Sequence, residues 1–396
     1  MLTLSLAIVS MKIVVALDSF KGCLTAEEAC EAAREGILSV KGDAEVVCVP
    51  LSDGGEGLVS CFLRMGKARV VRVRVHGPLM EEVTAEYAVS EGGETAYMEM
   101  ASACGLMLVP MDRRNPMEAT TYGLGEMMMD AVKRGVKHIV LGIGGSATCD
   151  AGMGMLEALG CDSWLNDEEV RWRPLNRRAP RRLTDVPHVG KAMCPTSVLT
   201  VACDVNNPLY GVEGAAYVFA PQKGATPEQV ELLDQRLRAF AKATEAMGIA
   251  TPEDAFHPGA GAAGGLGYAL LTYLRADLKQ GIEVVLDACR FEEMLQGADM
   301  VITGEGCSDV QTTHGKVAAG VVWRAQRLGV KTVLMSGQIK DREALLSYGF
   351  DCLCCINEGD ARPVAELMRT EVAKANIKRT CQRMMNHFIR PKNGRN

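Results

Sequence analysis

Short runs of β-branched and other apolar residues recur along the chain, each followed by a loop of Gly, Asp and Ser and then by a helical stretch. This order is typical of parallel α/β units. It predicts strands at residues 13–17, 46–51, 138–143 and 300–303, and the last unit continues through a helix at 317–327 to a strand at 331–335. After the first strand, Thr25 and Glu28 have the spacing of a capping box, so a helix should begin there.

The segment between the second and third units has a different periodicity. Apolar and polar residues alternate at 70–75, 83–89 and 96–100, and Gly-Pro and Gly-Gly pairs separate these runs. Such alternation indicates antiparallel strands joined by turns. The pattern as a whole predicts an α/β protein in which a doubly wound parallel domain is accompanied by a second α/β domain containing a mixed sheet.

Chain length and net charge limit the number of domains and the kinds of partner that the protein can have. A chain of 396 residues exceeds one ordinary hydrophobic core, which favours two domains. The net charge of −6 argues against a nucleic-acid partner, although the end of the chain, residues 381–396, forms a basic tail. No apolar run is long enough to span a membrane, so we expect no membrane association.

We assign no catalytic or binding role to the cysteines or to residues 1–10. The 15 cysteines are scattered through apolar runs, which is typical of small buried side chains in a reducing compartment. Met11 is followed at once by a strand, so residues 1–10 are expected to be an upstream extension without a functional role.

Four loops that follow predicted strands combine glycine with carboxylates, at residues 18–22, 52–57, 144–152 and 304–316. Glycine lets a backbone approach a phosphate closely, and the helix that follows presents free N–H groups to an anion. Carboxylates in the same loops would repel phosphate unless a divalent cation lay between them. The combination therefore points to a magnesium nucleotide.

The established sequence motifs of nucleotide-binding proteins and hydrolases are absent from this chain or match it only in part. The chain has no Walker A sequence and no G-x-S-x-G elbow. Residues 142–147 match G-x-G-x-x-A after a strand, with Asp167 at the distance of a ribose-binding acid, so an NAD-type oxidoreductase acting on a small hydroxy acid stays open. A non-catalytic nucleotide-binding module is the third possibility. Residues 259–264 match G-x-G-x-x-G but follow no strand and indicate a flexible turn into a helix.

Eight short motifs, taken in order along residues 11–380, resemble the bacterial glycerate kinase type 1 family. They are Asp18-Ser19-Phe20-Lys21-Gly22, Ser52-Asp53-Gly54-Gly55-Glu56-Gly57, Ala119-Thr120-Thr121-Tyr122-Gly123, Gly144-Gly145-Ser146-Ala147-Thr148, Ala202-Cys203-Asp204-Val205, Pro221-Gln222-Lys223-Gly224-Ala225-Thr226, the run from Pro258 to Gly267, and Gly304-Glu305-Gly306.

The resemblance implies ATP- and Mg²⁺-dependent phosphorylation of D-glycerate in the cytoplasm, usually giving 2-phosphoglycerate. It also implies a flavodoxin-like, Rossmann-like α/β/α domain built from both chain ends, here 11–66 and 290–380, with a second α/β domain inserted at 67–289. The oligomeric state and the choice between the two glycerate hydroxyls stay open.

The sequence departs from the family pattern in places. Cys149 stands where the family commonly has Asn, and Ala151 where it commonly has Gly. Residues 307–311 and the Arg- and Pro-rich segment 163–195 are also unusual. These changes affect the shape of loops rather than the expected reaction.

Phosphoryl transfer requires positioning and charge neutralisation more than covalent chemistry, which suggests a role for each kind of loop residue. We expect Lys21 to bind the glycerate carboxylate, Lys316 to neutralise charge on the transferred group, and one carboxylate to accept the hydroxyl proton. The candidates for that base are Asp18, Asp204 and Asp309; those for metal binding are Asp53, Glu56 and Glu305; those for cradling the nucleotide phosphates are Gly144, Gly145, Ser146, Thr148, Gly304 and Gly306.

Overall fold

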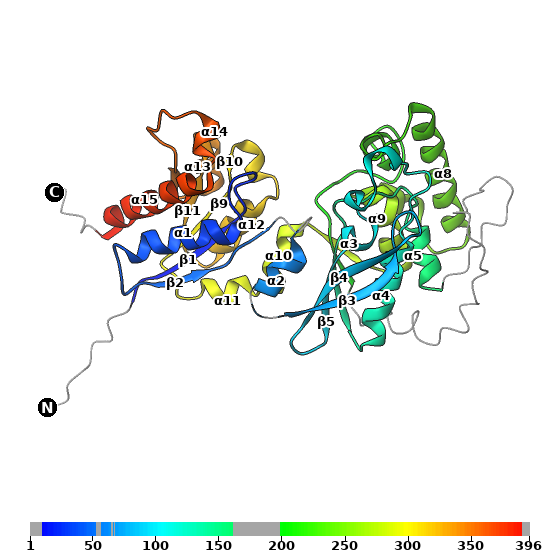
Figure 1. Cartoon of the computed structure of the whole chain (residues 1–396), viewed down its shortest axis with the longest axis horizontal. Coiled ribbons are helices and arrows are strands. Elements are labelled where there is room, and N and C mark those ends of the chain that lie inside the picture. The colour runs from blue at the N-terminus through cyan, green and yellow to red at the C-terminus, as the bar shows by residue number, and fades with distance from the viewer. Residues whose placement is uncertain (1–9, 53–56, 65, 67, 161–198, 390–396) are drawn as a thin grey trace. The chain divides into compact units, whose positions relative to one another are not determined.

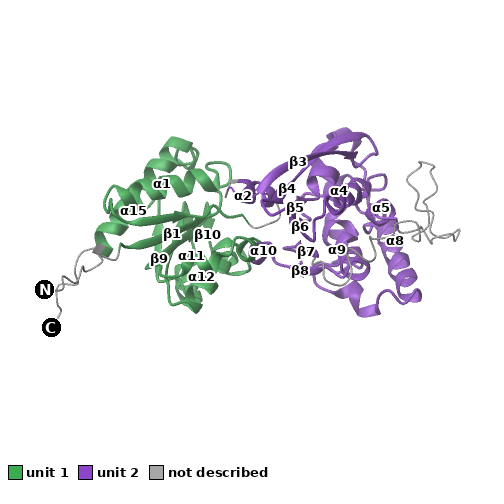
Figure 2. Cartoon of the chain, turned by 90° about the horizontal axis from the view of Figure 1, so that it is seen from below, with its two compact units in different colours: residues 1–53, 285–396 green, residues 54–284 purple. Residues whose placement is uncertain are grey.

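The computed structural model describes residues 10–52, 57–64, 66, 68–160 and 199–389. The chain divides into two compact units, one made of residues 1–53 with 285–396 and the other of residues 54–284 (Figure 2). The first unit is therefore formed by both ends of the chain. Each unit has its own sheet and its own hydrophobic core.

The first unit is built on a parallel five-stranded sheet with the strand order β13-β11-β9-β1-β2 (Figure 1). Its strands are β1 (Lys12–Leu17), β2 (Glu45–Cys48), β9 (Met300–Gly304), β11 (Lys331–Ser336) and β13 (Cys352–Cys355). The central strands β1 and β9 are mostly apolar and, apart from Lys12 at the start of β1, buried, as expected for strands covered on both faces.

Helices cover both faces of this sheet. α1 (Ala26–Leu38) and α15 (Thr370–Ile389) lie side by side on one face, and α12 (Val317–Arg327) and α13 (Arg342–Tyr348) pack on the other (Figure 1). Neighbouring residues of β11 divide between the faces, since Val333 and Met335 join the core under α1 and α15 while Leu334 packs with α12 and α13. This alternation is the structural basis of the doubly wound arrangement.

Shorter elements complete the first unit. They are α11 (Phe291–Leu295), β10 (Cys307–Ser308), η6 (Val310–Thr313), β12 (Gln338–Ile339) and α14 (Val364–Leu367), while α10 (Gly281–Ala288) spans the boundary with the second unit. The predicted capping box of Thr25 and Glu28 is present at the start of α1. The expected basic tail begins inside α15, where Cys381 and Met385 are fully buried, so residues up to 389 belong to a packed helix.

The second unit contains a six-stranded mixed sheet with the order β3-β4-β5-β6-β7-β8. Its strands are β3 (Ala68–His76), β4 (Glu82–Ser90), β5 (Thr95–Glu99), β6 (His138–Gly142), β7 (Leu199–Ala202) and β8 (Asp277–Lys279). β3, β4 and β5 pair antiparallel, as their alternating pattern predicts, whereas β5 to β8 pair parallel. β5 thus joins the antiparallel and parallel halves of the sheet.

The helices of the second unit pack their apolar faces into one core. They are α2 (Leu58–Arg64), α3 (Ala101–Cys104), α4 (Tyr122–Lys133), α5 (Met153–Ala158), α7 (Ala215–Phe219), α8 (Pro227–Ala246) and α9 (Ala262–Tyr273), with the 3-10 turns η1 (Leu106–Leu108), η2 (Met111–Arg113), η4 (Pro221–Lys223) and η5 (Pro252–Phe256). The predicted fold class, α/β with a parallel and a mixed sheet, is confirmed. Among the helices of the described residues, none is long and apolar enough to cross a membrane.

Candidate active site

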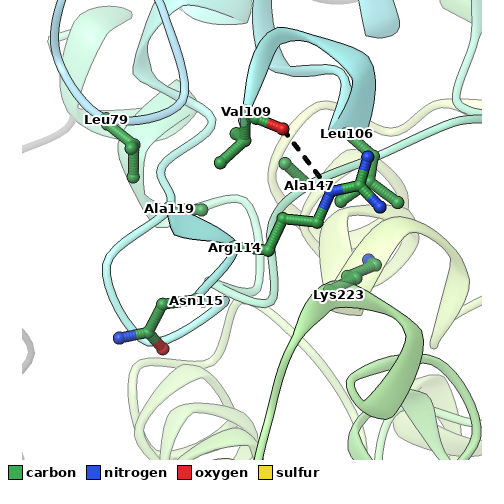
Figure 3. A pocket seen from close by; sticks show the side chains of 8 residues that line it. All are labelled: Leu79, Leu106, Val109, Arg114, Asn115, Ala119, Ala147 and Lys223. Atoms are coloured by element: carbon green, nitrogen blue, oxygen red, sulfur yellow. Dashed lines mark hydrogen bonds between the residues drawn. The ribbon is translucent and has the colours of Figure 1, made fainter. Parts of the chain in front are cut away.

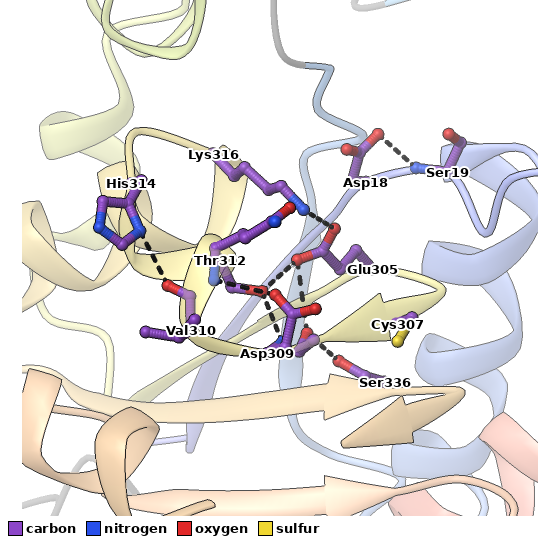
Figure 4. Close-up of polar contacts among 12 residues, drawn as sticks. Asp18, Ser19, Glu305, Cys307, Asp309, Val310, Thr312, His314, Lys316 and Ser336 are labelled. Atoms are coloured by element: carbon purple, nitrogen blue, oxygen red, sulfur yellow. Dashed lines mark hydrogen bonds and ion pairs between the residues drawn. The ribbon is translucent and has the colours of Figure 1, made fainter. Parts of the chain in front are cut away.

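The carboxyl end of the parallel sheet in the first unit gathers two of the predicted acids. Asp18 follows β1 and Glu305 follows β9, and the two strands are paired so that Leu17 stands opposite Gly304. The backbone N–H of Asp18 donates to the carbonyl of Gly304 at 2.9 Å. The two carboxylates therefore leave adjacent strands at the same edge, where α/β proteins bind ligands (Figure 4).

Glu305 is the centre of a hydrogen-bonded cluster (Figure 4). Its Oε1 accepts from the Thr312 hydroxyl at 2.7 Å and from the Ser308 hydroxyl at 3.5 Å. Its Oε2 lies 3.4 Å from the ammonium of Lys316, and its side chain is only 16% exposed. Ser308 is in turn held by Ser336 at 2.7 Å between the two hydroxyl oxygens. The carboxylate is thus fixed in orientation before any ligand binds.

Lys316 stands immediately before helix α12, whose bounds agree with the predicted ones. A helix N-terminus leaves backbone N–H groups free and favours negative charge. The side chain of Lys316 is 42% exposed and extends toward Glu305. The start of α12 therefore combines free amides with one cation, an arrangement suited to an anionic group.

In the loop after β9, the structure shows what Asp309, Gly304 and Gly306 do for the backbone. Asp309 caps η6 by accepting from the backbone N–H of Gln311 at 2.9 Å. Gly304 has φ 154°, and a Cβ there would lie 1.8 Å from the carbonyl oxygen of Met335, so only glycine fits beside β11. A Cβ at Gly306 would meet its neighbours at ordinary contact distance.

The remaining predicted residues of the first unit are less informative. Lys21 is exposed in the loop after β1. Asp53 and Glu56, two of the three predicted metal ligands, lie outside the described residues. Within the described ranges no group of three or more His, Cys, Asp or Glu side chains could hold a metal ion.

In the second unit, the loop after β6 is anchored by its backbone. The N–H of Leu106 donates to the carbonyl of Gly145 at 2.8 Å, and the N–H of Ala147 donates to the carbonyl of Cys104 at 2.9 Å. Gly145 has φ 68°, a conformation that favours glycine, and is exposed, whereas Ser146 and Thr148 are buried. Gly144 is partly buried.

Lys223 is a site residue that sequence reasoning missed. It comes from η4, far along the chain, yet its ammonium donates to the Ser146 hydroxyl and to the Thr148 carbonyl, each at 2.7 Å. Burial lowers the pKa of Lys223 to about 8. The available signal was its place in the motif from Pro221 to Thr226, one of the eight that carried the resemblance.

Asp150 holds the far end of the same loop. Its carboxylate accepts from the N–H and the hydroxyl of Thr121, both at 2.8 Å, and from the N–H groups of Gly152 at 3.1 Å and Gly154 at 3.2 Å. Burial raises the pKa of Asp150, and these donors oppose that effect. Asp150 therefore ties the loop to the segment that precedes α4.

Asp204 follows β7 and is exposed, and its Oδ1 accepts from the N–H of Gly281 at 2.8 Å, at the start of α10. It lies at the carboxyl edge of the second unit's sheet, in a different unit from Asp18 and Asp309. The three candidate bases therefore do not form one cluster within either unit.

The loop after β6 does not have the geometry of a dinucleotide fingerprint. That fingerprint needs a helix that opens directly from the glycine turn, so that the pyrophosphate meets the helix N-terminus. Here α5 begins only at Met153, and Ala147, Cys149 and Asp150 are buried before it. Residues 259–264, predicted to form a flexible turn into a helix, lead into α9, with Ala263 and Gly264 in the left-handed conformation.

Comparison with known proteins gives a consistent result. The family model "Glycerate kinase family" matches residues 13–389. A glycerate kinase of Bacillus subtilis (strain 168) is 45% identical over 351 residues, covering 88% of this chain and 91% of that protein. A glycerate 2-kinase of Escherichia coli (strain K12) is 40% identical over 348 residues, covering 87% of this chain and 90% of the relative.

A solved structure has the same architecture. The crystal structure described as glycerate kinase 2 from Salmonella typhimurium LT2 superposes with a TM-score of 0.77 at 36% identity, covering 98% of this chain and 100% of that one. The family model, the relatives and the fold agree over nearly the whole length. The chain therefore belongs to the glycerate kinase family of enzymes.

Proposed function

We propose that this enzyme transfers the terminal phosphoryl group of ATP to a hydroxyl of D-glycerate, giving 2-phosphoglycerate, with Mg²⁺ bound to the nucleotide. The observation that carries the proposal is the fixed Glu305–Lys316 pair at the start of α12, in a chain of this family. Phosphoryl transfer depends on such preset charges, because most of its catalysis is positioning and electrostatic stabilisation.

In the first unit, Lys316 is proposed to stabilise negative charge on the transferred group, together with the free N–H groups at the start of α12. Asp18 is the favoured general base, because it is partly buried at the end of a central strand whereas Asp204 is exposed. Asp309 is the less favoured alternative, since capping η6 already engages its carboxylate. Lys21, exposed in the loop after β1, is proposed to attract the glycerate carboxylate.

The oxygen donors of this unit are compatible with magnesium. Carboxylate and hydroxyl oxygens are the ligands that Mg²⁺ prefers, and Glu305, Thr312 and Ser308 supply them. When bound, Mg²⁺ would neutralise charge between phosphate oxygens. Glu305 is the described residue proposed to hold it, with Asp53 and Glu56 as further candidates. Gly306 leaves the backbone beside Glu305 open for a phosphate, and Gly304 lets that loop pass β11.

In the second unit, Gly144 and Gly145 are proposed to approach the nucleotide phosphates through their backbone. The support is that Gly145 is exposed while the loop is held rigidly by the backbone of Cys104 and Leu106 and by Lys223. Ser146 and Thr148 supply hydroxyls in the same loop. Asp150 is proposed to position the loop rather than to react, because every described contact of its carboxylate is structural.

The test is a coupled assay for ADP release with ATP, D-glycerate and MgCl₂, and ³¹P NMR of the product. The proposal expects turnover only when all three are present, loss of turnover with a chelator, and a 2-phosphoglycerate signal. Nicotinamide-linked oxidation of glycerate without ADP release would favour an oxidoreductase instead. ATP binding without turnover would favour a nucleotide-binding module, and a 3-phosphoglycerate signal would overturn the assignment of the hydroxyl alone.

A further inference from the structure

The two units hold the loops at the carboxyl ends of their strands by different means. In the second unit, the ammonium of Lys223 donates to the loop after β6. Figure 3 shows Lys223 and Ala147 of that loop among the side chains around a hollow that has no room for a ligand. In the first unit, the loop after β9 is held through its backbone by the segment that follows β11.

Three backbone hydrogen bonds join residues 305–308, which follow β9, to residues 337–340, which follow the neighbouring strand β11. The N–H groups of Gly337, Gln338 and Lys340 donate to the carbonyls of Glu305, Gly306 and Ser308, at 3.4, 3.1 and 2.8 Å respectively. The hydroxyls of Ser308 and Ser336 add a contact between the two segments (Figure 4). The backbone that carries Glu305 therefore takes its position from residues 337–340.

Gly337 allows the two segments to approach each other closely. A Cβ at this position would lie 2.6 Å from the carbonyl oxygen of Gly306, so any side chain here would push the loop after β9 aside. The carbonyl of Gly337 accepts from the side-chain amide of Asn357 at 2.9 Å and from the thiol of Cys355 at 3.4 Å. Asn357 follows β13, the strand on the other side of β11. Three adjacent strands are thus connected at their carboxyl ends.

Asn357 is itself oriented by helix α15. Its Oδ1 accepts from Nδ2 of Asn376 at 2.8 Å, and Oδ1 of Asn376 accepts from the guanidinium of Arg379 at 2.9 Å. Asn376 is only 1% exposed, so water competes little for its amide. A guanidinium can only donate and a backbone carbonyl can only accept. The two amides between Arg379 and Gly337 therefore have a single orientation that satisfies every group.

We propose that the side chains of Asn376 and Asn357 form an amide relay that positions the Glu305 carboxylate for phosphoryl transfer. The inference rests on the proposed function, in which Glu305 holds Mg²⁺. Both asparagines are positioning residues, because they fix Gly337, which fixes residues 305–308 and with them the carboxylate. A polar network whose members are all satisfied is rigid, and a small displacement of a ligating group slows catalysis even when its cause is remote.

Asn357→Leu removes the relay, because leucine keeps a branched side chain but can neither donate nor accept. We expect kcat for ADP release to fall about 10-fold or more, and the Mg²⁺ concentration that gives half the maximal rate to rise about 5-fold, because Glu305 is displaced. A merely structural role would lower the melting temperature and leave both kinetic quantities of the folded enzyme at their wild-type values. That result would overturn the proposal.

Asn376→Asp tests the relay without a change in side-chain size, and it decides the matter if Asn357→Leu does not fold. The new carboxylate can accept from Arg379 but cannot donate to Asn357, so the Asn357 amide must turn its own oxygen toward the carbonyl of Gly337. The same kinetic changes should follow. Because the two residues act in series, the double variant should be no worse than Asn357→Leu alone, whereas independent effects would multiply.

Gly337→Ala displaces the same loop without removing a hydrogen-bonding group of the relay. Its Cβ would press on the carbonyl of Gly306, so it should also lower kcat and raise the Mg²⁺ requirement. Gly42→Ala is the matched control in the first unit, because a Cβ there would lie at an ordinary 3.7 Å from the carbonyl oxygen of Leu38. Wild-type kinetics in a folded Gly337→Ala variant would show that the loop position does not matter and would overturn the proposal.

Hydrogen exchange of the substrate-free chain separates this inference from the proposed function. The amides of residues 337–340 should exchange at least about 10-fold faster in Asn357→Leu than in the wild type, while those of β1 stay unchanged. Unchanged exchange at 337–340 would overturn the relay whatever the activity. If exchange is faster but the kinetics stay wild-type, the positioning role is overturned and the proposed function stands. If the wild type releases no ADP with glycerate, the proposed function fails, and faster exchange would still support the relay as the support of the Glu305 loop.

Discussion

The two units present their charged loop residues in opposite ways. In the first unit, Lys316 is partly exposed and already paired with Glu305, whose own orientation is set by Thr312. In the second, Lys223 is buried and donates to neutral oxygens, and no carboxylate of the described residues forms an ion pair with it. An exposed, paired cation can act on a passing group at little cost to folding, whereas burying a cation without a carboxylate partner lowers the stability of the fold.

The largest effect should come from Lys316→Met. If Lys316 stabilises charge on the transferred phosphoryl group, kcat should fall by about two to four powers of ten, which corresponds to roughly 3 to 5 kcal/mol of transition-state stabilisation. The melting temperature should change little, because the lost ion pair is partly exposed. Steady-state kinetics and a thermal melt on one preparation measure both.

Lys331→Met is the matched control, because this exposed lysine lies at the opposite end of the same sheet, at the start of β11. It should retain wild-type kinetics. An unchanged kcat in Lys316→Met would remove that residue from the mechanism and leave the charge stabilisation to the α12 amides.

Asp150→Asn should damage the second unit through folding rather than through chemistry. Asn keeps the shape but turns one oxygen into an N–H donor, which would face the donors of Thr121, Gly152 and Gly154. Breaking a buried charged network of this kind costs about 3 kcal/mol. Urea unfolding should therefore show a lower free energy of unfolding, with activity lost in parallel.

A stable Asp150→Asn variant without activity would contradict this interpretation and place Asp150 among the reacting groups. Asp130→Asn provides a comparison on α4, where the carboxylate is bonded to Tyr87 and Arg134 nearer the surface. Asp130→Asn should lower the free energy of unfolding by less than Asp150→Asn does, by about 1 kcal/mol.

Lys223 predicts a pH dependence of stability with a definite sign. Burial lowers the pKa of Lys223 in the folded chain to about 8 from an ordinary value of 10.5, so between these pH values the unfolded chain binds a proton that the folded chain has released. The free energy of unfolding contributed by this group must therefore rise with pH across that window, by about 3 kcal/mol in total.

Urea unfolding of the wild type and of Lys223→Met at pH 7, 8.5 and 10 isolates the contribution of Lys223, because other groups titrate alike in both proteins. The free energy of unfolding of the wild type should increase relative to that of Lys223→Met as the pH rises. Parallel curves would contradict the lowered pKa of Lys223 in the folded protein.

The difference between the two units also explains which features the sequence could predict, because those of the first unit depend on local signals and those of the second on contacts between distant residues. The strands, the start of α1 and the whole of α12 follow from apolar runs, a capping box and the loop before Lys316, all of which are local signals. The partnership of Lys223 with Ser146 joins positions 77 residues apart, and the contact of Asp150 with Thr121 spans 29. Such contacts depend on how strands are ordered in a sheet, which no local pattern reveals.

The loop between Thr148 and α5 shows a further limit of local reasoning. The sequence identified Ala151 as a departure from the usual glycine, but only the backbone shows its consequence, a φ of 53° in a residue that is 1% exposed. Its N–H donates to the carbonyl of Gly264, so the loop is held in this conformation from outside. The backbone strain at Ala151 is therefore imposed by tertiary contacts.

The smallest expected effect is that of Ala151→Gly. The left-handed conformation costs an alanine about 1–2 kcal/mol, which glycine avoids. Against this stand about 0.8 kcal/mol for one buried methyl group and about 0.4–1 kcal/mol for the greater freedom of the unfolded chain. These terms nearly cancel, so the free energy of unfolding should change by less than about 1 kcal/mol. Ala241→Gly, at a fully buried position inside α8, has no strain to relieve and should cost about 2 kcal/mol. Urea unfolding of both variants measures the difference, and equal losses would show that Ala151 carries no backbone strain.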